Sequence, residues 1–237
     1  MKKFIFPIFK MFSDIMFQSK FNAFTLAEVL VTLGIIGVVA AMTMPTLISN
    51  HQKTVYVTQL KKVYTELSQA AKRAINDNNL VSLDEGKYTL YNPNAASEFF
   101  HTYFNIVQDC GTDLTPCFAE NYSNLSGGAV VLYPVRSFVG TLSSGAAICV
   151  FSNLFAIQED RSKHGYFDIY VDINGQAPPN ILGRDLFYMQ LYSDGKVAES
   201  YEANDYDYSR ETCLEHLSGY GARCLSVIIH DGWKMDY

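Results

Sequence analysis

Two different hydrophobic patterns follow each other in the first third of the chain. Residues 24–48, FTLAEVLVTLGIIGVVAAMTMPTLI, form an apolar run of 25 residues, and a helix of that length rises about 37 Å, enough to cross a membrane. After Asn50, apolar residues recur at spacings of three and four with charged residues among them: Val57, Leu60, Tyr64, Leu67, Ala71 and Ala74. We therefore expect one long helix with a membrane half, residues 24–50, and an amphipathic half, residues 51–78, that ends at the turn-forming residues 76–79.

The pattern changes after residue 79, where short runs of β-branched and aromatic residues alternate with turns. The runs that predict strands are 128–135, 146–157, 166–173, 185–192 and 196–203, with a hairpin at 193–195. Residues 98–106 predict a short helix, residues 140–145 a turn, and residues 201–209 an exposed acidic loop. The predicted fold class is α+β: a long N-terminal helix packed on an antiparallel sheet, with residues 79–237 as one β-rich head.

Composition adds a constraint on what covers the apolar surface. Among the 237 residues, 49% are apolar and only 18% are charged, so we expect lipid or a neighbouring subunit to cover part of the surface. The formal net charge of −6 argues against a large basic face. We therefore expect no nucleic-acid partner.

The five cysteines divide into two close pairs and one single residue. Cys110 lies near Cys117 in the sequence, and Cys213 lies near Cys224. Two short loops closed by disulfides would suit an extracytoplasmic head, and reduced, buried thiols are the alternative. Cys149 lies in the apolar run AAICVFSN, and we expect a buried free thiol there.

Catalytic patterns are weak in this sequence. The five histidines, at 51, 101, 164, 216 and 230, form no HExxH motif and no Cys-His pair at zinc spacing. Ser143 and Ser144 lack the GxSxG frame of a nucleophile elbow, and no glycine-rich phosphate loop appears. We predict that the chain is not an enzyme.

Glu28 is the one ionisable residue in the apolar run. An unpaired carboxylate in lipid costs several kcal/mol, on the order of the insertion cost of other charged side chains, so a partner or neutralisation is expected. A glutamate that reaches the membrane surface without a partner is the alternative.

The residues before the run carry the most specific signal. Residues 1–23 contain Lys2, Lys3, Lys10 and Lys20 and end in the small residue Ala23, so the apolar core follows the small residue, whereas in a secretory signal peptide it precedes it. A charged leader ending in Ala23, followed by FTLAE at the start of a long apolar helix, resembles the prepilin class of type IV pilins and type II secretion pseudopilins. Met11 and Met16 are alternative starts for this leader.

The resemblance implies a set of residue roles and a pilin-like lollipop fold. Cleavage would fall between Ala23 and Phe24, with N-methylation of Phe24; the family's usual residue before the cut is glycine, so Ala23 departs from the pattern. The new α-amino group would then be a partner for Glu28, either in the same helix or from a neighbouring subunit. The family often carries a proline at the place of Pro45, where the helix can partly unwind in the filament.

A loop in the head raises the question of a metal. VDINGQAPPNILGRDLF places Asp172, Asn174 and Asp185 around a Gly- and Pro-rich loop, and oxygen ligands at alternating positions suit calcium. It resembles a recurring loop of bacterial prepilin-like proteins that ends near GWK, here residues 232–234. No glutamate closes the loop as in an EF-hand, and the alternative is a structural turn in which Asp172 and Asn174 cap their own backbone.

These features lead to one expected function and one rival. We expect a pilin, minor pilin or pseudopilin: a single-pass protein of the inner (cytoplasmic) membrane with an extracytoplasmic head, processed by a prepilin peptidase and methyltransferase and assembled with other pilin or pseudopilin subunits by helix packing. For Cys213 and Cys224, the resemblance suggests a C-terminal loop stapled to the head. The rival is a membrane-tethered binding, adhesion or hydrolase protein that uses a prepilin-like anchor.

Overall fold

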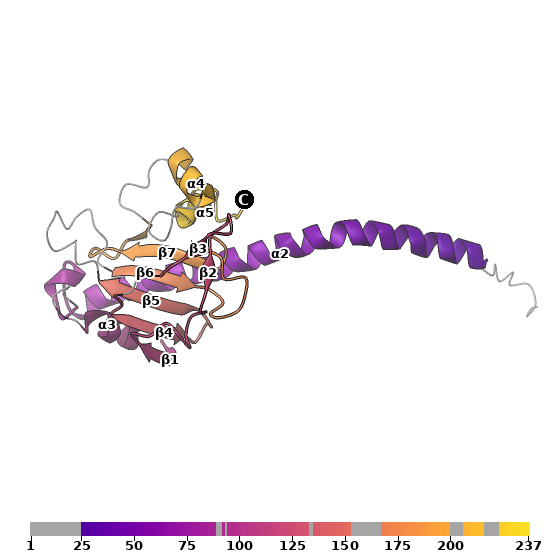
Figure 1. Cartoon of the computed structure of the whole chain (residues 1–237). Helices are drawn as coiled ribbons and strands as arrows, with labels where there is room; N and C mark the ends of the chain where they lie inside the picture. Colours follow the sequence, from indigo (N-terminus) through magenta and orange to yellow (C-terminus); the bar gives the residue numbers. More distant parts are fainter. Residues whose placement is uncertain are drawn as a thin grey trace, which may run out of the picture. The chain divides into compact units, whose positions relative to one another are not determined.

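In the computed structural model of the chain, the described residues are 25–88, 92, 94–132, 135–152, 167–199, 206–215 and 223–237. The chain divides into two compact units, residues 1–49 and residues 50–237. The boundary falls inside one continuous helix, α2 (Leu26–Asp77), which has 52 residues and is the longest element in Figure 1. The expected long helix is therefore present.

The end of α2 shows why the helix stops where the sequence predicted. Asn79 adopts φ +52°, the left-handed region that asparagine tolerates better than most residues. The Leu80 N–H donates to the Ile75 carbonyl at 2.9 Å, and the Asn79 N–H donates to the Asn76 carbonyl at 3.1 Å. These two bonds are the Schellman pattern that satisfies the last carbonyls of a helix.

The head contains an antiparallel sheet of six strands in the order β1-β4-β5-β6-β7-β8. Figure 1 shows β1, β4, β5, β6 and β7 of this sheet side by side. Their bounds are β1 (Ile106–Gly111), β4 (Phe138–Leu142), β5 (Ala147–Ser152), β6 (Phe167–Asp172), β7 (Leu186–Leu191) and β8 (Val197–Ala198). A separate pair is formed by β2 (Tyr122–Ser123) and β3 (Ala129–Val130).

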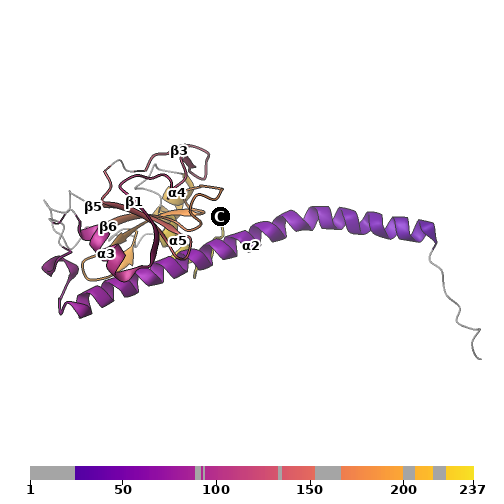
Figure 2. The ribbon, with the colours of Figure 1, turned by 90° about the horizontal axis from the view of Figure 1, so that it is seen from below.

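The second half of α2 lies along one face of the sheet, as Figures 1 and 2 show from two directions. The face that it turns to the core carries Val57, Leu60, Val63, Leu67, Ala70, Ala71 and Ala74, all buried. Burial of such a stripe stabilises the helix by roughly 25 cal/mol per Å² of apolar surface. The predicted stripe is confirmed, except that Tyr64 is only half-buried and donates its hydroxyl to the Val197 carbonyl at 3.2 Å.

The remaining helices are short. The 3-10 helix η1 (Leu83–Glu85) and α3 (Ala95–Tyr103) follow α2, and α3 packs on the sheet through the ring pairs Phe99–Phe167 and Phe100–Phe138. Near the C-terminus, α4 (Tyr206–Glu215) and α5 (Cys224–His230) pack against each other, and α5 packs on β7.

Several local predictions were wrong. Residues 140–145 were expected as a turn, but β4 runs to Leu142 and the turn follows it; the strand contains Gly140, which weakens its sequence signal. β1 and β2 were missed, and of the acidic loop expected at 201–209, residues from Tyr206 onward are helical. Parts of the strands expected at 128–135, 146–157, 166–173 and 196–203 lie outside the described residues.

Candidate membrane and assembly site

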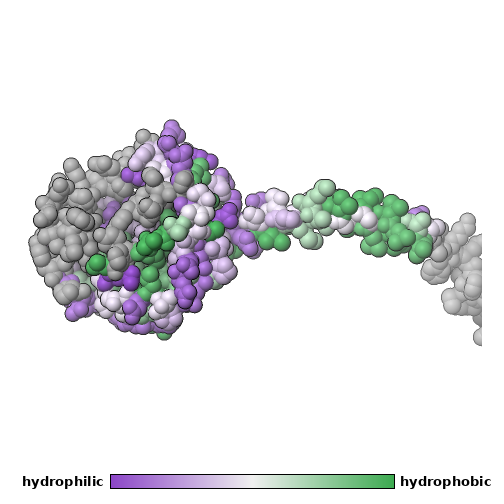
Figure 3. Space-filling model, in the orientation of Figure 1, coloured by the Kyte–Doolittle hydropathy of each residue, from purple (hydrophilic) through white to green (hydrophobic). Residues whose placement is uncertain are grey.

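The first half of α2 presents apolar side chains on all sides. Between Leu26 and Ser49 nearly every residue is exposed, for example Leu30 at 61%, Ile36 at 63% and Met42 at 73%. In the described part of the chain, α2 is the one helix long and apolar enough to cross a membrane, and its most apolar stretch is not buried. Figure 3 shows this apolar surface along the helix.

The start of α2 is fixed by a reciprocal pair of side chains. The Glu28 carboxylate accepts a hydrogen bond from the Thr25 backbone N–H at 2.9 Å and from the Thr25 hydroxyl at 2.8 Å. The Thr25 hydroxyl in turn accepts from the Glu28 backbone N–H at 3.2 Å. Thr25 is thus the N-cap and Glu28 the third helical residue of a capping box, which satisfies N–H groups that have no partner in the helix.

The capping box was missed in the sequence, although T-x-x-E before an apolar run is its signature. It gives the lone carboxylate partners within its own helix. Ala23 and Phe24, the residues at the expected cleavage site, lie outside the described residues. The capping box is available whether the residue before Thr25 is a free amino terminus or part of a leader.

Other polar groups of the apolar segment also find partners locally. The hydroxyls of Thr32 and Thr43 donate to the carbonyls of Glu28 and Val39, one turn earlier, at 2.9 and 3.0 Å. Pro45 lies inside α2, which stays helical through it. Because proline has no N–H, the Ala41 carbonyl loses its donor in the helical ladder.

Both close cysteine pairs are joined in the structure. Cys110–Cys117 has an S–S distance of 2.06 Å and Cys213–Cys224 one of 2.08 Å. Cys149 is a buried free thiol, and burial raises its pKa to about 12. Such a thiol stays protonated and unreactive at neutral pH.

The loop that carries the candidate calcium ligands is held by hydrogen bonds. Asp172 accepts from the Tyr122 hydroxyl at 2.5 Å and from the Asn174 N–H at 3.2 Å. Asp185 accepts from the backbone N–H groups of Asn180 and Ile181 at 2.7 and 2.6 Å. The carboxylates therefore cap the backbone of their own loop, the arrangement expected of a structural turn.

The same loop keeps unsatisfied oxygens and perturbed acids. Burial raises the pKa of Asp172 to about 7, and burial also raises the pKa of Asp185. The Oδ1 atoms of Asn174 and Asn180 are buried without a hydrogen-bond partner among the described residues. Within those residues, no cluster of three or more His, Cys, Asp or Glu side chains is placed to hold a metal ion.

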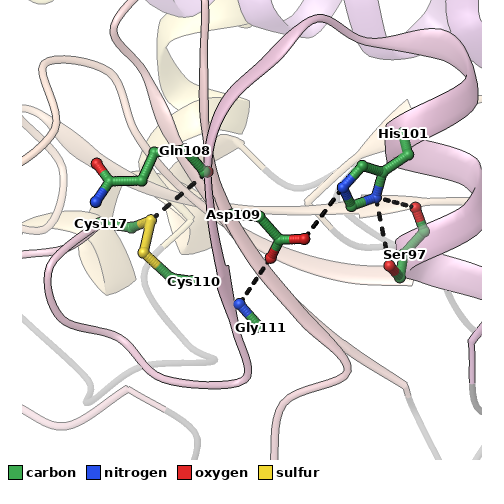
Figure 4. Close-up of polar contacts among 7 residues, drawn as sticks. All are labelled: Ser97, His101, Gln108, Asp109, Cys110, Gly111 and Cys117. Atoms are coloured by element: carbon green, nitrogen blue, oxygen red, sulfur yellow. Dashed lines mark hydrogen bonds and ion pairs between the residues drawn. A yellow bond between two sulfur atoms is a disulfide. The ribbon is translucent and has the colours of Figure 1, made fainter.

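A serine, a histidine and an aspartate meet between α3 and β1, as Figure 4 shows. His101 Nδ1 lies 2.8 Å from the Ser97 carbonyl oxygen and 3.4 Å from the Ser97 hydroxyl, while Nε2 lies 3.1 Å from Asp109 Oδ2. A carbonyl only accepts, so Nδ1 carries a proton and is not a base for the hydroxyl. The side chains of His101 and Asp109 are 43% and 48% exposed, and we interpret the contact as a surface tie between helix and strand.

Comparison with known proteins bears on the N-terminal part of the chain. No curated protein and no solved structure matches the chain. The prokaryotic N-terminal methylation motif matches residues 18–44, a range that includes Ala23, Phe24, the capping box and most of the apolar segment. The chain therefore carries the prepilin-type signature at its N-terminus.

Proposed function

We propose that this chain is a subunit of a type IV pilus or type II secretion filament. The observation that supports this best is a bare apolar half-helix that opens with Thr25 and Glu28 inside a prepilin-type methylation motif. An uncovered apolar helix of this length needs lipid or other helices around it. In the precursor, membrane lipid surrounds this helix. In the mature subunit, the helices of neighbouring subunits in the filament surround it.

In this proposal, processing creates a positively charged partner for the Glu28 carboxylate. A prepilin peptidase cuts between Ala23 and Phe24, and Phe24 is N-methylated, which leaves a cationic amino group one residue before Thr25. That amine, from the same chain or from a neighbour, neutralises the Glu28 carboxylate inside the membrane or the bundle. The capping box supplies hydrogen bonds but no positive charge, so both interactions have a role.

Two features of the apolar segment fit contact with other helices. A Cβ added at Gly34 or Gly37 would meet nothing within 4 Å, so neither glycine is needed for packing inside this chain. Small residues let helices approach closely in lipid. Pro45, with its missing N–H, gives the helix a point at which it can loosen on assembly.

The location follows from the same elements. The apolar segment anchors the chain in the cytoplasmic membrane with one pass, and the head lies outside the cytoplasm until the subunit enters a filament. The two disulfides support an oxidising compartment for the head. Other pilin or pseudopilin subunits and the prepilin peptidase are the proposed partners.

Two substitutions at Glu28 separate its charge from its capping bonds. Glutamine at the third helical position can still complete a capping box, whereas alanine cannot. We expect both Glu28→Gln and Glu28→Ala to reach the membrane and both to be lost from filaments, measured as the sheared-filament fraction against the membrane fraction. Thr25→Val, which removes the capping hydroxyl and keeps the charge, is the matched control and should still assemble.

The outcomes also address the rival of a membrane-tethered binding protein. Normal incorporation of Glu28→Gln would show that the charge is not needed and would refute the proposed role. If the wild-type chain stays in the membrane fraction while a filament forms from other subunits in the same cells, the anchor-only rival is the better account.

A further inference from the structure

A groove lies in the head directly after the apolar segment ends. It has a volume of about 420 Å³ and is lined by the first turns of the second half of α2 and by the last residues of the chain: Asn50, Lys53, Thr54, Val57, Thr58, Trp233, Lys234, Met235 and Asp236. The lining thus combines two amino groups, an amide, a carboxylate and two hydroxyls with apolar side chains. Both hydroxyls donate to carbonyls of their own helix, at 3.0 and 2.8 Å. This mixture is typical of a site for a polar headgroup on an apolar stem.

The charged side chains around the groove differ in whether they already have a bonding partner. Lys53 Nζ donates to a main-chain oxygen of Tyr237 at 2.6 Å, which ties the C-terminal segment to α2. Lys234 is exposed and has no ion pair among the described residues, while Asp236 adds one negative charge to the lining. Lys61, about two turns after Lys53 along the helix, lies 5.3 Å from the centre of the Trp233 ring and adds a further cation nearby.

Trp233 is held at the groove in a costly backbone conformation. The chain leaves α5 through Gly232, at φ +69°, and Trp233 follows at φ +63°, where a bulky residue is uncommon. The Trp233 N–H donates to the Ile228 carbonyl at 2.8 Å, and the Tyr64 ring meets the indole edge to face at 5.3 Å. Strain of this kind persists where the surrounding structure fixes a side chain in place, and such places are often functional.

The position of the groove along the helix matches the headgroup layer. Lys53 follows Ile48 by five residues, which along an α-helix is a rise of about 7.5 Å. The polar layer outside the hydrocarbon core is about 5–8 Å thick on each side. Tryptophan and lysine are the residues that favour this layer, since one has an amphipathic ring and the other a cation on a long apolar stem.

We propose that this groove binds the phosphate of an anionic phospholipid headgroup, with Lys234 supplying the positive charge and Trp233 the apolar contact. The inference rests on the proposed membrane anchoring of residues 24–50. A lipid bound there holds the base of the head against the membrane surface before assembly.

The test is a lipid titration of the full-length chain in detergent, read by native mass spectrometry with phosphatidylglycerol and phosphatidylcholine as the two probes. We expect phosphatidylglycerol to bind at least fivefold more tightly. Lys234→Gln should weaken that binding by about fivefold, the usual contribution of one lysine at an anionic surface, and Asp236→Asn should strengthen it. Lys62→Gln, at an exposed lysine of α2 outside the groove, is the matched control and should change nothing.

Each other outcome overturns the proposal. Equal binding of the two lipids, or an unchanged preference in Lys234→Gln, would show that the groove does not select a phosphate headgroup. Competition by soluble glycerol phosphate at equal concentration would assign the groove to a free phosphate compound. If Lys234→Gln lowers filament incorporation and leaves lipid binding unchanged, the groove is a contact between copies. A chain missing from the membrane fraction would instead count against the anchoring itself.

Discussion

Two carboxyl groups in this protein lie where water is scarce, and each accepts hydrogen bonds from donors close by. Glu28, in the apolar segment, takes hydrogen bonds from Thr25. Glu199, buried in the head, accepts from the backbone N–H groups of Leu225 and Ser226 at 3.3 and 2.9 Å and so caps the start of α5. Donors that point at a carboxylate relieve part of the cost of burying it.

Glu199 should make the head less stable as pH rises. Burial raises its pKa from an ordinary value of 4.5 to about 8, so the folded chain holds the proton more tightly than the unfolded chain does. The contribution of Glu199 to the free energy of unfolding is then greatest below pH 4.5 and falls as pH rises to about 8. We expect Glu199→Gln to flatten that part of the curve of urea midpoint against pH.

The control for this prediction is Glu211→Gln, at an exposed position of α4. It should leave the slope between pH 5 and pH 8 as in the wild-type chain. A Glu199→Gln variant that is as pH-dependent as the wild type would show that the buried carboxyl does not govern the stability of this region.

At the scale of elements, the C-terminal helices depend on a covalent link. The Cys213–Cys224 disulfide joins α4 to α5, and a Cβ at Gly183 would come within 2.6 Å of Cys224 Sγ, so the loop before β7 packs directly against the link. Gly183 also has φ +89°, which a side chain would rarely adopt. The loop, the disulfide and α5 therefore form one packed unit.

Replacing Cys213 and Cys224 together by serine should lower the free energy of unfolding by about 2–3 kcal/mol, because the open loop regains conformational freedom in the unfolded chain. Urea unfolding of the full chain in detergent, followed by near-UV circular dichroism, measures the change. The Cys110–Cys117 disulfide closes a slightly shorter loop. Replacing both of its cysteines by serine should therefore lower the free energy of unfolding a little less. An unchanged midpoint in the first variant pair would contradict the structural role of the link.

The loop with Asp172, Asn174 and Asp185 gives a second prediction at this scale. Both carboxylates already accept two hydrogen bonds each, so we expect calcium to bind weakly if at all and to shift the unfolding midpoint of the head little. Isothermal calorimetry with calcium, before and after chelation, measures this. Tight binding would show that the unpartnered oxygens of Asn174 and Asn180 act as ligands together with the carboxylates.

At the scale of the whole molecule, sequence patterns predicted the long-range organisation better than the local detail. The length of the apolar run and the three-and-four spacing after it were enough for α2, because both depend on many residues at once. β1 and β4 were missed because IVQDCG and FVGTL are short and mix polar residues or glycine with apolar ones. α4 was missed because YDYSRETCLE has little apolar periodicity and is held by the disulfide and by α5.

The functional residues also differ in how far the sequence predicts them. Glu28 stood out in the sequence because a single carboxylate in an apolar run is conspicuous, and the capping box could have been found from T-x-x-E. The groove beside Trp233 could not, because it joins residues 50–58 with residues 233–236 and depends on where the head brings the end of the chain.

The proposed function requires that a leader is removed to expose an amine that can neutralise the Glu28 carboxylate. Mass spectrometry of the chain purified from membranes of cells with an active prepilin peptidase tests it most directly. We expect a mature chain that begins with N-methylated Phe24. A chain that still carries the residues before Phe24 in those membranes, or one cut at another position, would contradict it.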